Sequence, residues 1–226
     1  MKLIIDDANI ANIRELYEYY PVEGVTTNPS ILAKCGGEPF RVLGEIRAFI
    51  GEDELHVQTV AADAEGIVKD AHRILRELGD KTYVKIPAVP EGFKAMKQLH
   101  REGVRITATA VYTPMQAYLA GQCGAEYAAP YVNRIDNMGF NGVEVAKTIH
   151  DIYVKNGMST QVLAASFKSP EQVIRVALSG GHTATLPPDV LKGLLTHPLT
   201  GAAIDSFASD WNNTFGGATL REMLSK

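Results

Sequence analysis

The sequence predicts a single (β/α)8 barrel of the α/β class with an additional C-terminal helix. Short apolar runs rich in Val, Ile, Thr and Tyr occur eight times, and segments with helical periodicity alternate with them up to residue 195. No long linker, low-complexity segment or shift in composition interrupts this alternation. Eight such repeats favour a compact closed barrel over an open doubly wound sheet. We therefore expect one domain over residues 1–226.

The eight predicted strands are short and mostly apolar, as expected for parallel strands that are buried on both faces. In order along the chain they lie at 3–5, 24–26, 55–57, 83–85, 105–107, 127–129, 162–164 and 183–186.

The clearest predicted helix covers residues 63–78, where Ile67, Ala71 and Ile74 fall on one face. Asp63 and Ser169 are good N-cap residues, and Pro170 suits the first turn of a helix. The other predicted helices lie at 10–20, 40–50, 92–101, 114–122, 143–155, 170–178 and 188–195.

The segment 200–226 is extra to the eight strand–helix units. Its Ile204, Phe207, Trp211 and Phe215 form an apolar stripe at roughly helical spacing. One interpretation is a helix that caps this chain's own barrel, and the other is an arm that docks on a neighbouring subunit.

Composition excludes several classes of partner. The net charge is −4, and no basic block or basic stripe with interleaved aromatic residues is present, so nucleic acid is not expected. No stretch approaches the roughly 18 apolar residues of a membrane span, and no signal peptide is evident. Two cysteines, Cys35 and Cys123, are too few for a disulfide framework. We expect a cytoplasmic protein without a membrane partner.

The histidines show no spacing typical of metal ligands, such as HExxH, and neither cysteine lies beside a histidine or a basic cluster. We therefore expect no metal and no cofactor.

Lys85 is the most informative residue, because it lies in an apolar, β-branched run that is typical of a buried strand. Burial disfavours a charged ammonium and lowers its pKa, so such an amine is nucleophilic near neutral pH. This predicts Schiff-base chemistry. The alternative is a structural lysine that extends its charge to solvent or pairs with a carboxylate.

Polar side chains gather at the predicted carboxyl ends of seven strands, where barrels of this kind carry their active sites. Individually some have simpler explanations: Asn28 before Pro29 suits a turn or a cap, and Arg134 could pair with Asp136. Their coincidence favours a catalytic mouth. The set comprises Asp6, Thr26, Asn28, Gln58, Lys85, Thr109, Tyr131, Arg134, Ser166 and Lys168.

These strand ends also carry motifs that resemble the transaldolase family of class I aldolases, strand by strand over the whole chain. The matching motifs are GVTTNPS at 24–30, VKIP at 84–87, TATAVY at 107–112, APYVNRID at 129–136 and AASFK at 164–168.

Within that family, three positions resemble the fructose-6-phosphate aldolase pattern more than the transaldolase pattern. Transaldolases typically carry Phe where this chain has Tyr131 and Glu where it has Gln58. The small transaldolases usually have Gly where this chain has Asn133.

The resemblance implies a role for each residue at the lysine. Lys85 would attack the C2 ketone of a ketose phosphate and form an iminium. Asp6 would orient hydroxyls and assist proton transfers. Gln58, Thr109 and Tyr131 would hold a water that relays the proton of the C4 hydroxyl, with Tyr131 as the acid/base partner.

Substrate binding is implied for the remaining residues. Asn28, supported by Thr26, would bind the hydroxyls of the dihydroxyacetone portion. Arg134 and Ser166 would bind the phosphate of the glyceraldehyde 3-phosphate portion. Lys168 lies where longer transaldolases place a second phosphate-binding arginine.

The expected function is a Schiff-base aldolase that cleaves fructose 6-phosphate reversibly to dihydroxyacetone and glyceraldehyde 3-phosphate. The alternatives are a transaldolase, which passes the dihydroxyacetone unit to an aldose phosphate, and a sugar-phosphate-binding barrel without catalysis. The expected partners are small sugar-phosphate and hydroxyketone substrates. The resemblance also implies a homo-oligomer, either a pentameric ring or a decamer of two such rings.

Overall fold

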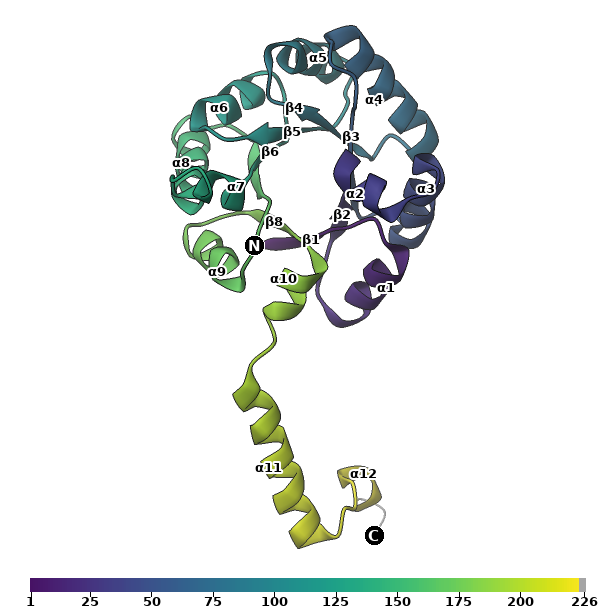
Figure 1. Cartoon of the computed structure of the whole chain (residues 1–226), viewed down its shortest axis with the longest axis vertical. Coiled ribbons are helices and arrows are strands. Elements are labelled where there is room, and N and C mark those ends of the chain that lie inside the picture. The colour runs from purple at the N-terminus through teal and green to yellow at the C-terminus, as the bar shows by residue number, and fades with distance from the viewer. Residues whose placement is uncertain (224–226) are drawn as a thin grey trace. The chain divides into compact units, whose positions relative to one another are not determined.

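Eight parallel strands close into a barrel in sequence order, with β1 pairing both β2 and β8, in a computed structural model that describes residues 1–223 (Figure 1). The predicted (β/α)8 architecture, a TIM barrel with an additional C-terminal helix, is confirmed. The strands are β1 (Lys2–Asp6), β2 (Gly24–Thr26), β3 (Glu54–Gln58), β4 (Tyr83–Pro87), β5 (Ile106–Val111), β6 (Tyr127–Pro130), β7 (Gln161–Ala164) and β8 (Thr183–Leu186).

Most helices surround this ring of strands and cover its outer face, whereas α2 is drawn over β2 and buries none of its residues (Figure 1). Most of them start and stop within a few residues of the predicted positions. They are α1 (Ile10–Tyr19), α2 (Pro29–Cys35), α3 (Pro39–Ile50), α4 (Ala64–Leu78), α5 (Pro90–Arg101), α6 (Pro114–Gln122), α7 (Val132–Asp136), α8 (Gly142–Lys155), α9 (Pro170–Leu178) and α10 (Pro188–Gly193).

Local sequence signals explain several of these boundaries. The Asp63 carboxylate accepts a hydrogen bond from the Gly66 N–H at 2.8 Å, and the Ser169 hydroxyl accepts one from Gln172 N–H at 3.3 Å, so both predicted caps are confirmed. Proline occupies the first turn of α2, α3, α5, α6 and α9, where its missing N–H costs no helical hydrogen bond. Two short helices, α2 and α7, were not predicted.

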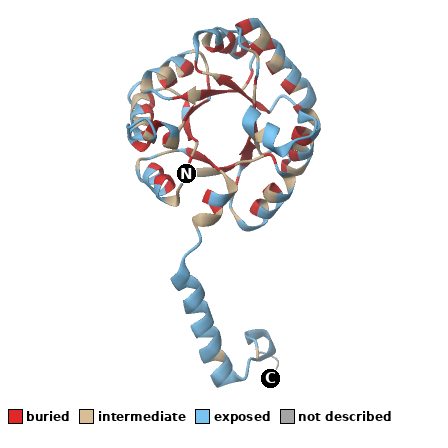
Figure 2. Ribbon diagram, viewed as in Figure 1, coloured by how far each residue is buried: buried red, intermediate tan, exposed pale blue. Residues whose placement is uncertain are grey.

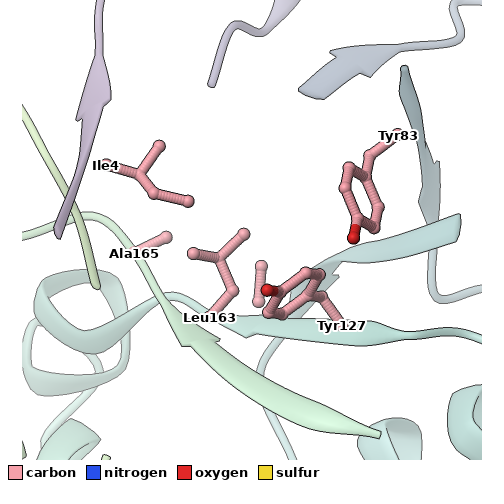
Figure 3. Packing of buried hydrophobic residues seen from close by; sticks show 6 residues of the cluster. Ile4, Tyr83, Tyr127, Leu163 and Ala165 are labelled. Atoms are coloured by element: carbon pink, nitrogen blue, oxygen red, sulfur yellow. The ribbon is translucent and has the colours of Figure 1, made fainter. Parts of the chain in front are cut away.

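The core lies on the strands and on the inward faces of the helices (Figure 2). On α4, Ile67, Ala71, Ile74 and Leu78 are buried, as their spacing predicts. Inside the barrel, Ile4, Tyr83, Tyr127, Leu163 and Ala165 belong to one packed cluster (Figure 3).

The chain divides into two compact units, Met1–Leu191 with the barrel and a second unit that begins at Lys192. The second unit contains α11 (Pro198–Phe215) and α12 (Leu220–Met223). α11 carries the predicted apolar stripe, of which Ile204 and Phe207 are exposed. The predicted extension over 200–226 therefore contains a helix, and its last three residues lie outside the described part of the chain.

Candidate active site

Lys85 lies inside the barrel on β4, and only 5% of its surface is exposed. Its Nζ donates a hydrogen bond to the backbone carbonyl of Thr27 at 2.6 Å. Burial lowers the pKa of Lys85, and the negative charge of Asp6 partly opposes this shift. The amine is therefore closer to its nucleophilic free-base form than an exposed lysine, and it does not extend its charge into solvent.

Asp6 ends β1 and is held by a chain of two threonine hydroxyls. Thr26 Oγ1 donates to Asp6 Oδ1 at 2.7 Å, and Thr185 Oγ1 lies 2.6 Å from Thr26 Oγ1. Since the Thr26 proton is given to the carboxylate, Thr185 donates to Thr26. Burial raises the pKa of Asp6, although the charge of Lys85 and the Thr26 hydrogen bond oppose the rise. A carboxyl group in this setting takes up a proton more readily than an exposed one.

Asn28 follows β2 and is the N-cap of α2. Its Oδ1 accepts a hydrogen bond from the Ile31 N–H at 3.0 Å, and Pro29 occupies the first helical position. The cap fixes the amide plane and uses its oxygen. Asn28 lines the cavity, and its side-chain nitrogen is not used by the cap and can donate to a hydroxyl group.

Thr109 and Tyr131 form a pair on the side of Lys85 away from β3. Thr109 Oγ1 lies 2.8 Å from the Tyr131 hydroxyl, and Thr109 is fully buried. Gln58 lies on the other side, as the β3 neighbour of Lys85 in the sheet register. Within the described residues Gln58 makes no direct hydrogen bond to this pair, so the pair and Gln58 lie on two sides of the lysine.

Arg134 lies on the short helix α7, which begins directly after Tyr131. Its guanidinium carbon lies 4.8 Å from the centroid of the Tyr131 ring, and the residue is exposed. The alternative role in an ion pair with Asp136 is not observed. The Asp136 carboxylate instead accepts hydrogen bonds from Gly142 N–H and the Gln172 side chain, both at 2.7 Å. The guanidinium is thus left to bind an anion at the mouth.

Strained backbone also marks this end of the barrel. Ala110 and Ser166 are the non-glycine residues of the described chain with positive φ, 54° and 62°. The Ala110 conformation coincides with a register shift between β5 and β6, and Ser166 accepts a hydrogen bond from Asn133 N–H at 3.0 Å through its carbonyl. Such conformations cost about 1–3 kcal/mol each and persist where the surrounding structure enforces them, often at functional sites.

One cavity of about 840 Å³ collects most of the predicted site. Two of the ten predicted residues, Thr26 and Thr109, do not line the cavity. Thr26 hydrogen-bonds to Asp6, and Thr109 hydrogen-bonds to Tyr131. The residues that line it are Asp6, Asn28, Gln58, Lys85, Tyr131, Arg134, Ser166 and Lys168.

The arrangement of this cavity suits addition to a carbonyl group. It offers a poised amine, a carboxyl group with a raised pKa and a phenol within one pocket, together with cations at the rim. Within residues 1–223, no group of three or more His, Cys, Asp or Glu side chains is arranged to hold a metal ion. The helices of the described chain include none that is long and apolar enough to cross a membrane.

A family model described as transaldolase/fructose-6-phosphate aldolase matches residues 3–220. The chain belongs to this family. The resemblance found in the strand-end motifs is therefore confirmed. The transaldolase/fructose-6-phosphate aldolase family consists of Schiff-base enzymes that act on sugar phosphates. Membership supports this chemistry but does not decide between aldolase and transaldolase activity.

Sequence reasoning missed Thr185, Ala110 and the carbonyl of Thr27. Thr185 is buried on β8, the one strand to which no site residue was assigned, and it completes the hydroxyl chain to Asp6. An inward-facing threonine near the end of an apolar strand was the available signal. Nothing in the sequence indicated the positive φ of Ala110.

Proposed function

We propose that this member of the family is a class I aldolase that cleaves fructose 6-phosphate reversibly to dihydroxyacetone and glyceraldehyde 3-phosphate. The observation that carries the proposal is the buried Lys85 amine with the Thr109–Tyr131 hydroxyl pair on one side and Asp6 in electrostatic contact. This combination supplies both a nucleophile and groups that move protons.

In the forward direction the Lys85 amine attacks C2 of the ketose, and the resulting carbinolamine loses water to give an iminium. Asp6 supplies and receives the protons of these steps, because its raised pKa allows it to hold one. Asn28 binds the hydroxyls of the dihydroxyacetone portion with its free amide nitrogen. The iminium then accepts the electron pair of the C3–C4 bond as that bond breaks.

Bond cleavage also requires loss of the proton on the C4 hydroxyl. We assign this proton to Tyr131 through a water held by Gln58 and Thr109, since these side chains surround Lys85. The aldehyde product leaves, and the same group returns a proton to C3 of the enamine. Water then hydrolyses the new iminium, which releases dihydroxyacetone and the free Lys85 amine.

The phosphate of the substrate is assigned to the rim of the cavity. Arg134 offers a planar fork of donors, and Ser166 and Lys168 line the same cavity. The exposed position of Arg134 suits a group that meets the phosphate at the mouth rather than the reacting carbons.

Transaldolase activity is the second candidate, because the family includes both reactions. Tyr131 and Gln58 favour the aldolase: release of dihydroxyacetone needs a mobile proton and water near the enamine, and a phenol provides the proton. The decisive assay follows glyceraldehyde 3-phosphate formed from fructose 6-phosphate, with and without erythrose 4-phosphate. Turnover without the acceptor, suppressed in Tyr131→Phe, supports the aldolase, whereas turnover only with the acceptor establishes the transaldolase.

The Schiff base has its own test. Borohydride added with dihydroxyacetone should inactivate the enzyme and leave one stable adduct on Lys85, because hydride reduces the imine to an amine that cannot hydrolyse. Peptide mapping locates the adduct. Label on another lysine, or no label, contradicts the assignment and favours a barrel that only binds sugar phosphates.

We also propose that the protein is a homo-oligomer, either a pentameric ring or a decamer, in which the apolar stripe of α11 contacts a neighbouring subunit. The exposed Phe207 and Ile204 within the second unit support this assignment. Light scattering on the intact chain measures the mass. A monomeric mass would favour the alternative of a helix that caps its own barrel.

A further inference from the structure

The interior of the barrel holds a group of polar side chains beside the apolar cluster of Ile4 and Leu163, although TIM barrels usually fill this space with branched apolar side chains. Lys2, Glu54, His56, Thr107 and Tyr127 each precede, along their own strand, a residue assigned to the proposed reaction. His56 and Thr107 have no exposed surface. A buried polar group of this kind is costly unless each of its hydrogen bonds is made.

These five side chains form one connected hydrogen-bond chain, which we call the floor network. Lys2 Nζ donates to Glu54 Oε1 at 2.7 Å, and the Tyr127 hydroxyl donates to the same oxygen at 3.1 Å. Glu54 Oε2 lies 3.3 Å from His56 Nε2, and His56 Nδ1 lies 2.8 Å from Thr107 Oγ1. Figure 3 shows Tyr127 in this part of the interior. The floor network thus ends at Thr107.

The protonation states of Glu54 and His56 determine which atom donates in each hydrogen bond of the floor network. Burial raises the pKa of Glu54, but hydrogen bonds from His56 and Lys2 outweigh this and lower it to about 2, so the group is a carboxylate. Burial lowers the pKa of His56 to about 4 despite the nearby Glu54 charge, so the ring is neutral at pH 7. A carboxylate only accepts, which places the ring proton on Nε2. His56 Nδ1 must then accept the Thr107 proton.

Thr107 is the β5 partner of Lys85 in the sheet register, and both side chains point into the barrel. Because the Thr107 hydrogen is committed to His56, the lone pairs of its oxygen are directed away from the ring. We propose that His56 is a positioning residue that turns the Thr107 hydroxyl so that its oxygen faces Lys85 and stabilises the positive iminium there. This inference rests on the proposed Schiff-base function.

Two pairs of substitutions test the proposal, and in each pair one variant removes the acceptor or the hydroxyl and the other keeps it. Thr107→Val removes the oxygen and Thr107→Ser keeps it. His56→Phe removes the acceptor, whereas His56→Asn keeps an acceptor near the position of Nδ1. The readout is the fraction of chains trapped on Lys85 by borohydride at increasing dihydroxyacetone concentration, measured by intact-mass spectrometry.

We expect Thr107→Val and His56→Phe each to weaken imine formation about fivefold to tenfold, the effect of one neutral hydrogen bond. The double variant should be no weaker than either single variant, because both changes remove the same interaction. Thr107→Ser and His56→Asn should recover most of the loss. Thr160→Val, which removes a buried hydroxyl that donates to the Ala125 carbonyl and does not line the cavity, is the control for general destabilisation.

The outcomes separate this proposal from the proposed function. If the unmodified protein forms no adduct on Lys85, the Schiff-base assignment is wrong. If it forms the adduct and Thr107→Val traps as well as the unmodified protein, the positioning role is wrong. Equal losses in Thr107→Val, Thr107→Ser and Thr160→Val would show that the floor network is only structural. Should His56→Phe fail to fold, the two Thr107 variants still decide.

Discussion

The pKa shifts of buried charged groups differ between the mouth of the barrel and the floor network. Around the mouth, burial lowers the pKa of Lys85 and raises that of Asp6, so the charged forms are disfavoured. In the floor network, Glu54 is kept ionised by Lys2 and by hydrogen-bond donors. Polarity alone therefore does not indicate reactivity in a barrel. Incomplete compensation of buried charge distinguishes the mouth from the satisfied network below it.

The largest expected effect comes from Lys85→Met. Removal of the nucleophile should lower kcat/KM for fructose 6-phosphate cleavage by about four orders of magnitude or more. Stability should be unchanged or higher by about 1 kcal/mol, since an incompletely compensated buried amine is replaced by an apolar chain of similar length. Steady-state assays and urea unfolding measure the two quantities, with the exposed Lys69→Met as the control. A large loss of stability would show that Lys85 stabilises the fold as the floor network does, and would contradict the proposed difference between the two layers.

Glu54→Gln should lower the stability of the fold, in contrast to Lys85→Met. The pKa of Glu54 lies at about 2 in the folded chain against an ordinary 4.5, so its carboxylate contributes about 3 kcal/mol of stability above pH 4.5 that is lost as the pH falls toward 2. His56, at about 4 against 6.5, adds a loss between pH 6.5 and 4. Urea unfolding at pH 7, 5 and 3 should show declining stability, with a lower value at pH 7 and a weaker decline below pH 4.5 in Glu54→Gln. Glu65→Gln, in an exposed pair, should change neither.

Arg134→Ala tests whether the rim of the mouth binds the substrate phosphate separately from the reaction at Lys85. We expect KM for glyceraldehyde 3-phosphate in the synthesis direction to rise about tenfold to a hundredfold, because a charge-assisted hydrogen bond contributes about 1.5–3 kcal/mol. KM for unphosphorylated glyceraldehyde should hardly change. Equal increases for the two aldehydes would instead assign Arg134 a structural role through its stacking on Tyr131.

The smallest expected effect concerns Ala110→Gly. Glycine adopts the positive φ of this position without the cost of about 1–2 kcal/mol that alanine incurs, but its unfolded chain has more entropy to lose. The net gain in stability should be about 0.5 kcal/mol, with a fewfold lower kcat. Thermal unfolding and steady-state assays measure both. Ala128→Gly, in the regular part of β6, should only destabilise.

Much of the barrel could be predicted because each strand and most helices carry their own local signals. Apolar β-branched runs give the strands, and residues such as Asp63 and Ser169 give the helix starts. The helices α2 and α7 were missed because they are short, so neither is long enough to show a helical period in the sequence.

The mouth was more predictable than the floor. Residues that end strands converge in any parallel barrel, so Lys85 and Asp6 could be placed together from the sequence. The contact between Lys2 and Glu54 depends on register around the closed sheet. It also depends on Gly24, which pairs with Glu54 on the intervening strand and has no side chain there. Local sequence patterns reveal neither the register nor the tilt of the strands.

Closure of the barrel through β1 and β8 has a consequence for the newly made chain. Lys2 pairs with Thr183, and Thr185 reaches Thr26, so the surroundings of Asp6 and Lys85 form only after almost all of the barrel has been synthesised. Until then Lys85 is an ordinary solvated ammonium, because its lowered pKa requires complete burial. If Lys85 is the proposed Schiff-base lysine, the incomplete chain is therefore expected not to react with aldehydes and ketones during translation. The lowered pKa of Lys85 thus arises only when the barrel closes.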